Sequence, residues 1–139
     1  MKKILILSFL ALFLSSCELI DDDDGDVRFT SEFLPIESVD IPDEFSLGEV
    51  YPIKVTYQRP TSCHVFRNLY YAKENNERTV AIITAVFERN DCETLTDEMV
   101  ERSFNFKVTS NGSYIFKFWQ GKDDNDEDIY LTIEVPVVD

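Results

Sequence analysis

The sequence is poor in the residues that most catalytic and metal sites require. Its 139 residues include only one histidine, and no G-x-S-x-G, G-x-G-x-x-G or P-loop glycine pattern occurs. His64 directly follows Cys63, but no second histidine and no C-x-x-C pair is present to complete a zinc site. We therefore expect no enzymatic activity and no cofactor.

Basic side chains are also scarce. The chain has 13 Lys and Arg against 27 Asp and Glu, a net charge of −14. Binding to nucleic acid needs clustered Lys and Arg to neutralise phosphates, so nucleic acid is not an expected partner. The acidic excess is typical of a soluble, self-repelling surface protein. Because carboxylates are abundant, one enzymatic alternative stays open, glycoside hydrolysis by a carboxylate pair.

The apolar run near the N-terminus is too short to span a bilayer. It extends from Ile4 to Leu14 without a charge, whereas a spanning helix needs about 20 residues. Two lysines precede the run, and small residues follow it. This order is that of a signal peptide, so residues 1–16 are left out of the fold.

The stretch Leu14-Ser15-Ser16-Cys17 resembles the lipobox of bacterial lipoproteins. The resemblance implies cleavage between Ser16 and Cys17, diacylglycerylation of the Cys17 thiol and acylation of the new amino terminus. More than one acyl chain gives stable anchoring, since each buried CH₂ contributes about 0.8 kcal/mol. We therefore expect an outer-membrane lipoprotein held to the membrane by its lipid. The alternatives are an ordinary secretory signal and an uncleaved helix.

An acidic run follows Cys17 closely, with Asp21 to Asp24 in succession and Asp26 after them. Such a segment repels itself and cannot bury surface, so residues 17–36 are predicted to be a flexible tether. The run also resembles the export signal of surface-exposed lipoproteins of the Bacteroidetes, which implies display outside the cell. The alternative is a solvated spacer. A calcium site in this run would lack the spaced ligands of an EF-hand loop.

Lipidation of Cys17 leaves Cys63 and Cys92. Two remaining cysteines in an exported chain predict a disulfide. A Cys63–His64 metal or nucleophile site is the weaker alternative.

From residue 37 onward the hydrophobic period is two rather than 3.6, which predicts strands. In the segment 49–57, for example, Ile53 and Val55 alternate with Lys54 and Thr56. Strands are predicted near residues 38–41, 49–57, 64–72, 79–88, 99–109, 113–120 and 128–137.

The segment NGSYIFKFW, residues 111–119, resembles the sixth strand of many bacterial immunoglobulin-like domains, in which a tyrosine follows a turn. The resemblance implies one all-β domain over residues 37–139, an antiparallel immunoglobulin-like β-sandwich of about seven strands, with Tyr114 as a tyrosine corner. Phe116 stands where such domains often carry a cysteine. Cys63 and Cys92 are therefore expected near one end of the sandwich. Another small β-sandwich is the alternative.

Alternation along residues 113–120 and the facing strand predicts an outward set of side chains. The set is Ile115, Lys117, Trp119 and Tyr130. Exposed tryptophan and tyrosine suit a sugar-stacking or protein-docking face. In an immunoglobulin-like sandwich the third strand would add His64, Phe66 or Tyr70 nearby. The alternative is that Trp119 only covers the edge of the core.

The loop before the last strand places Asp123, Asn125 and Glu127 at alternate positions, the start of an oxygen-ligand pattern for Ca²⁺. Asp128 follows where an EF-hand loop would have glycine, so a solvated hairpin tip is the default expectation.

These features predict a non-catalytic, lipid-anchored cell-envelope module that serves protein interaction, adhesion or scaffolding. The alternative is a glycan- or small-ligand-binding accessory of a nutrient-uptake system.

Overall fold

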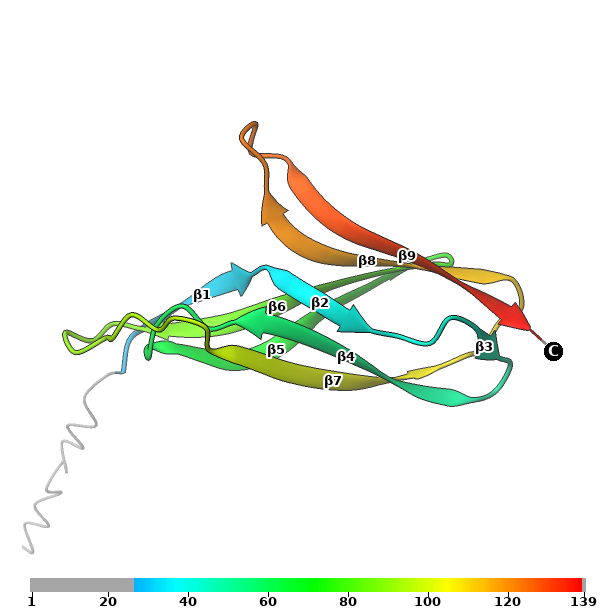
Figure 1. Ribbon diagram of the computed structural model, residues 1–139, viewed down its shortest axis with the longest axis horizontal. Coiled ribbons are helices and arrows are strands. Elements are labelled where there is room, and N and C mark those ends of the chain that lie inside the picture. The colour runs from blue at the N-terminus through cyan, green and yellow to red at the C-terminus, as the bar shows by residue number, and fades with distance from the viewer. Residues whose placement is uncertain (1–26, 139) are drawn as a thin grey trace, which may run out of the picture.

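The computed structural model describes residues 27–138, which form strands and loops arranged as two sheets (Figure 1). The strands are β1 (Phe29–Leu34), β2 (Ile36–Asp40), β3 (Phe45–Ser46), β4 (Val50–Gln58), β5 (His64–Glu74), β6 (Glu77–Phe87), β7 (Met99–Lys107), β8 (Ser113–Lys122) and β9 (Asp128–Val138). Within this part of the chain, no helix is long and apolar enough to cross a membrane. The predicted all-β class is confirmed.

All seven predicted strands are present, and β1 and β3 are additional. β1 falls within residues 17–36, which were predicted to be a flexible tether, so that prediction is wrong for residues 29–34. The whole of β1 pairs with β6, from Phe29 opposite Phe87 to Leu34 opposite Ile82. This pairing satisfies the backbone of β1 and buries Leu34, which is 3% exposed.

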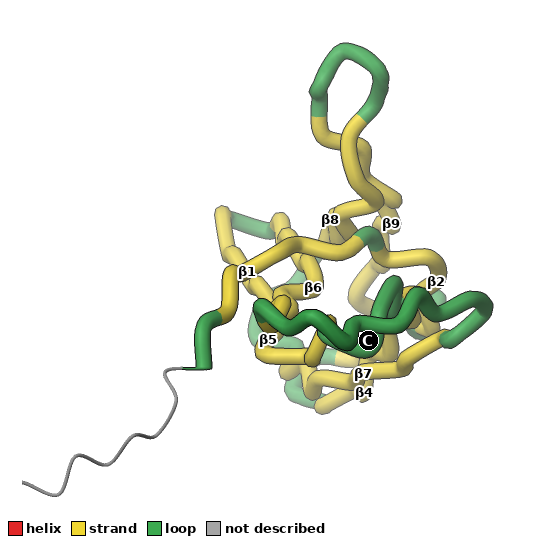
Figure 2. Tube along the Cα trace, turned by 90° about the vertical axis from the view of Figure 1, so that its left-hand side faces the viewer, coloured by secondary structure: helices red, strands yellow, loops and turns green. Residues whose placement is uncertain are grey.

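The smaller sheet has the order β2-β4-β7 and is antiparallel throughout. In the six-stranded sheet β6 pairs with β5, β1 and β8, β9 follows β8, and β3 lies beside β9. The predicted antiparallel arrangement is wrong for two pairs, because β6 with β8 and β3 with β9 are parallel. Between β6 and β8 the chain crosses to the smaller sheet and forms β7 there. β8 therefore runs beside β6 in the same direction as β6. The tip of the β8–β9 hairpin projects beyond both sheets (Figures 1 and 2).

The core between the sheets is rich in aromatic rings. Phe45 is fully buried, and its ring centroid lies 4.9 Å from that of Tyr51 and 5.3 Å from that of Phe106. Burying a phenylalanine side chain stabilises a fold by about 1.5 to 3 kcal/mol, so this cluster holds the two sheets together. The fully buried large side chains are Ile36, Phe45, Ile53, Val55, Tyr57, Val80, Ile82, Val108, Tyr114, Phe116, Phe118 and Val135.

Tyr114 connects this core to the turn before β8. Its ring is 1% exposed, and its hydroxyl accepts hydrogen bonds from the backbone N–H groups of Thr109, at 3.2 Å, and Ser110, at 3.0 Å. The buried hydroxyl is therefore satisfied, and the chain entering β8 is fixed.

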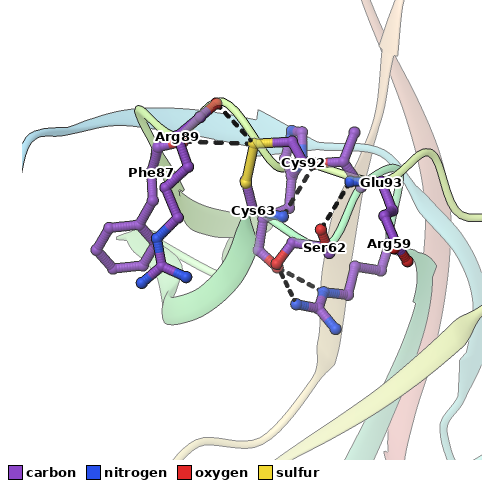
Figure 3. The surroundings of a disulfide bond; sticks show 9 residues. Arg59, Ser62, Cys63, Phe87, Arg89, Cys92 and Glu93 are labelled. Carbon is purple, nitrogen blue, oxygen red and sulfur yellow. Dashed lines mark hydrogen bonds between the residues drawn. A yellow bond between two sulfur atoms is a disulfide. The ribbon is translucent and has the colours of Figure 1, made fainter.

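Cys63 and Cys92 form the predicted disulfide (Figure 3). Cys63 directly precedes β5, and Cys92 lies in the loop that follows β6. Beside it, the Ser62 N–H donates to the Glu93 carbonyl and the Glu93 N–H donates to the Ser62 hydroxyl, both at 2.9 Å. The loop is therefore fastened to the segment before β5 at one end of the sandwich.

Replacing both cysteines, Cys63→Ala with Cys92→Ala, is expected to lower the free energy of unfolding by about 3 to 4 kcal/mol. The chain-entropy model gives this value for a loop with ends 29 residues apart. Urea unfolding measures the change, and dithiothreitol should destabilise the native protein equally while leaving the double variant unaffected. A loss below about 1 kcal/mol would show that the fastened loop needs no covalent closure.

Candidate functional site

β8 presents alternate side chains to the core and to the outer face of the six-stranded sheet. Tyr114, Phe116 and Phe118 are at most 1% exposed, whereas the residues between them are partly exposed. Trp119 pairs with Tyr130 of β9, so both side chains lie on this outer face. Trp119 and Tyr130 therefore face outward, as expected from the sequence.

A hollow of about 360 Å³ opens on the outer face around these two residues. Its walls are aromatic side chains from four strands, its floor is two small side chains of β6, and an ion pair lies at one end. We call it the aromatic hollow; its residues are Phe33, Tyr70, Thr79, Ala81, Trp119, Lys122, Asp128 and Tyr130.

The aromatic hollow lies where β6 changes its neighbour. Val80 is the last β6 residue paired with β8, opposite Phe118, and Ile82 is paired with β1, opposite Leu34. Ala81 lies between these two pairings, and its small side chain leaves the space under the aromatic walls open. The divergence of β8 from β6 and the insertion of β1 therefore create the hollow.

β8 bends next to this point. Its register with β9 breaks between Trp119 and Lys122, and Gly121 within the break has a φ of +102°. Only glycine adopts this conformation at little cost. The break carries the end of β8 past Pro35, whose Cγ would lie 3.5 Å from a β-carbon built on Gly121. It also brings Lys122 and Asp128 to the rim of the hollow.

The indole of Trp119 is held in place by its neighbours. Its Nε1–H donates to Oδ1 of Asp128 at 3.0 Å, and its ring centroid lies 6.0 Å from that of Phe33 in an edge contact. Lys122 Nζ lies 3.3 Å from the same carboxylate oxygen. The hydrogen bond from Trp119, together with Lys122, lowers the pKa of Asp128 below its ordinary value of 3.8.

Two of the four residues predicted for this face line the hollow, Trp119 and Tyr130. Lys117 lies beside it, with Nζ 4.6 Å from the ring centroid of Tyr130. Ile115 lies farther along β8, opposite Glu134.

The third predicted strand adds Tyr70, as expected, whereas His64 and Phe66 do not line the hollow. Phe33 was missed because its strand was assigned to the tether. The alternation of Phe29, Ser31 and Phe33 with Thr30 and Glu32 was the available signal.

Exposed apolar side chains recur along β1 and β5 beyond the hollow, and Ser31 and Arg67, joined by a 2.9 Å hydrogen bond, lie between them. Phe33 and Tyr70 are 48% and 44% exposed, and Phe29 and Val65 are 44% and 43% exposed. The strand register places all four on the outer face. The guanidinium of Arg67 lies 5.1 Å from the ring centroid of Phe29. We call these four side chains, together with the aromatic hollow, the outer apolar surface.

The acidic hairpin tip is organised by its own hydrogen bonds. Oδ1 of Asp123 accepts the backbone N–H of Asn125 at 2.8 Å and that of Glu127 at 3.0 Å. The Asp123 carboxylate therefore closes the turn. This hydrogen bonding explains the acidic residue at position 123 without a bound Ca²⁺. In residues 27–138 no group of three or more His, Cys, Asp or Glu side chains is arranged to hold a metal ion.

The remaining candidates are placed as follows. His64 is 8% exposed, with Nε2 2.8 Å from Oε2 of Glu32 and Nδ1 2.7 Å from the Thr61 hydroxyl. Both ring nitrogens thus have partners, and the contact with Glu32 fastens β1 to β5. Ser16 and Cys17 lie outside the described residues.

Comparison of the chain with protein-family models, with curated proteins and with solved structures finds no match. What the site can do therefore follows from its own geometry. The hollow offers ring faces for stacking, small side chains at its floor and a fixed Lys122–Asp128 pair at its rim.

Trp119 is the only tryptophan, so its fluorescence reports on the hollow. The folded-state pKa of Asp128 lies below 3.8, so its hydrogen bond to the indole is complete above that pH and is lost as the pH falls through the folded pKa. We expect an emission change with a midpoint below pH 3.8. Asp128→Asn should abolish this change, and Asp124→Asn at the hairpin tip should not. A midpoint above 3.8, or the same transition in both variants, would contradict the contact.

Proposed function

We propose that this chain is a non-catalytic, lipid-anchored module of the bacterial cell envelope that binds a protein partner through its outer apolar surface. The observation that carries the proposal is that four aromatic side chains wall a hollow on one sheet face, and exposed Phe29 and Val65 lie on the same face. Monomeric soluble proteins rarely leave large contiguous apolar patches exposed, and such patches are typical of interaction sites.

The composition of the surface favours a protein partner. Protein interfaces are enriched in aromatic residues and arginine and depleted in acidic residues at their centres. The outer apolar surface has Arg67 over Phe29 and Lys117 over Tyr130. The chain as a whole carries a net charge of −14, so this face differs from the average of the molecule. It suits a partner segment that inserts an apolar anchor residue into the hollow and places acidic groups beside it.

Glycan binding is the second candidate, and the rim of the hollow favours it. Sugar rings stack on aromatic faces, and their hydroxyl groups need polar partners close by. Trp119 and Tyr130 offer the faces, and Lys122 and Asp128 offer the polar groups. In this alternative the ligand occupies the hollow without covering Phe29 and Val65.

We also propose that the sandwich is a variant of the immunoglobulin-like arrangement. The separate β2-β4-β7 sheet, the β8–β9 pair and the hydroxyl contacts of Tyr114 support this relation. The departure is the position of β6 between β5 and β8, since strands corresponding to β5 and β8 are neighbours in that fold.

The anchor that we propose is the lipid on Cys17, which the acidic residues 21–26 separate from β1. Export through this run is tested by protease treatment of intact cells, comparing the native protein with a variant in which Asp21 to Asp24 are changed to Ser. We expect cleavage of the native protein and protection of the variant, with Cys17→Ala released from the membrane fraction. Protection of both membrane-bound proteins would place the module in the periplasm.

The binding face is tested by photo-crosslinking in intact cells, with p-benzoylphenylalanine in place of Tyr70. We expect a discrete protein adduct that is absent when the probe replaces Met99, a 49% exposed residue of the other sheet. Adding Trp119→Ala should reduce the adduct several-fold, because aromatic anchors at interface centres contribute about 2 kcal/mol or more. Met99→Ala is the matched control.

Equal adducts from both positions, or an adduct that does not depend on Trp119, would contradict a specific protein site on this face. An adduct with a glycan in place of a protein would identify the second candidate as correct.

A further inference from the structure

A second hollow, of about 390 Å³, lies at the open edge between β5 and β7. Three basic side chains line it, Lys73 from β5, Arg78 from β6 and Lys107 from β7, together with Asn105 and Thr109. No Asp or Glu is among its lining residues. In a chain with 27 acidic and 13 basic residues, this separation of charge sets the hollow apart from the rest of the molecule. We call it the cationic hollow.

Arg78 is the unusual member of this group because it is almost entirely buried, at 4% exposed. Its Nη1 donates to the backbone carbonyls of Asn75, at 2.8 Å, and Glu77, at 2.9 Å. Its buried Nε has no hydrogen-bond partner in the described chain. A guanidinium has five N–H donors and stays charged at all physiological pH values, so part of its donor capacity is unused.

Arg78 forms no ion pair in the described chain. Within residues 27–138 no carboxylate lies within 4.0 Å of Arg78, Lys73 or Lys107. The guanidinium lies 5.1 Å from the ring centroid of Tyr114 and 5.8 Å from that of Phe106. These ring faces offset part of the cost of burying a cation, but they supply no hydrogen-bond acceptor.

Aromatic side chains form part of the lining of the cationic hollow. Tyr71 and Phe104 line the hollow, and their ring centroids lie 5.8 Å apart in an edge contact. Burial raises the pKa of the Tyr71 hydroxyl, and the positive charge of Arg78 and a side-chain hydrogen bond to it oppose this rise. An anion at this position would meet the positive charge of a mostly buried guanidinium, and its hydrogen bonds to that group would be charge-assisted.

We propose that the cationic hollow binds an oxyanion group, a carboxylate or a sulfate or phosphate ester, through the guanidinium of Arg78. The planar fork of arginine matches the geometry of these groups, and Lys73 and Lys107 at the mouth attract them. The hollow is larger than a bare anion, so the group is carried by an organic body that packs against Tyr71 and Phe104.

This site is separate from the aromatic hollow. Tyr70 and Tyr71 are consecutive residues of β5, and Arg78 and Thr79 are consecutive residues of β6, so their side chains leave opposite faces of the same sheet. The two hollows lie back to back across β5 and β6. Ligands of the two sites can therefore be tested independently.

The test is a titration of ¹⁵N-labelled protein with sodium sulfate, phosphate or acetate, with sodium chloride keeping the ionic strength constant. The signal is the Nε–H resonance of Arg78 together with the backbone amides of residues 71–73 and 105–107. We expect a saturable shift at these positions. Lys73→Gln with Lys107→Gln should weaken the affinity about ten-fold by removing two positive charges near the anion. Arg28→Gln with Lys54→Gln, which removes two positive charges elsewhere, should leave it unchanged.

The lysine variants keep Arg78 and the core intact, so they avoid the loss of folding that Arg78→Gln risks. Saturation by acetate alone assigns the site to carboxylates, and saturation by sulfate or phosphate assigns it to their esters. The proposal is overturned if none of the three anions gives a saturable shift, or if the Lys73 and Lys107 variant binds as tightly as the native protein.

Discussion

The hydrogen-bonding edge of β6 is the constraint on which the rest of the structure depends. A strand edge accepts one partner at each position, yet this edge serves β8 as far as Val80 and β1 from Ile82 onward. β8 must therefore diverge where β1 begins, and Ala81 is left between them beneath large side chains of both. The aromatic hollow and the projecting β8–β9 hairpin are both consequences of this change of partner (Figure 1).

The same change of partner couples the proposed anchor to the proposed binding surface. The chain that leads from Cys17 enters the domain as β1, and β1 contributes Phe29 and Phe33 to the outer apolar surface. Pairing with β6 and the contact of Glu32 with His64 fix this strand. A partner on the outer face therefore touches β1, the first strand of the described chain, so binding would stabilise the strand that follows the proposed anchor.

Hydrophobic alternation was sufficient to predict the seven main strands, and cysteine number was sufficient to predict the disulfide. Hydrophobic alternation was also sufficient to place Trp119 and Tyr130 on one face, because side-chain direction within a strand has a period of two. Neighbour relations between distant strands leave no such local signal. The parallel pairing of β6 with β8, and hence the position of Phe33 beside Trp119, could not be predicted from alternation alone. The burial of Arg78 likewise could not be predicted from the sequence, because it depends on how distant strands pack around it.

The most direct test of this account is a proton NOE measurement on the free protein, from the indole ring of Trp119 to the ring of Phe33. The two ring centroids are 6.0 Å apart in an edge contact, so cross-peaks between their protons are expected, together with cross-strand contacts from Phe33 to Ile83. They would show that β1 closes one wall of the hollow. If the indole gave contacts to Asp128 and Tyr130 but none to Phe33, β1 would not occupy the edge of β6, and the outer apolar surface would lack the wall on which its proposed function rests.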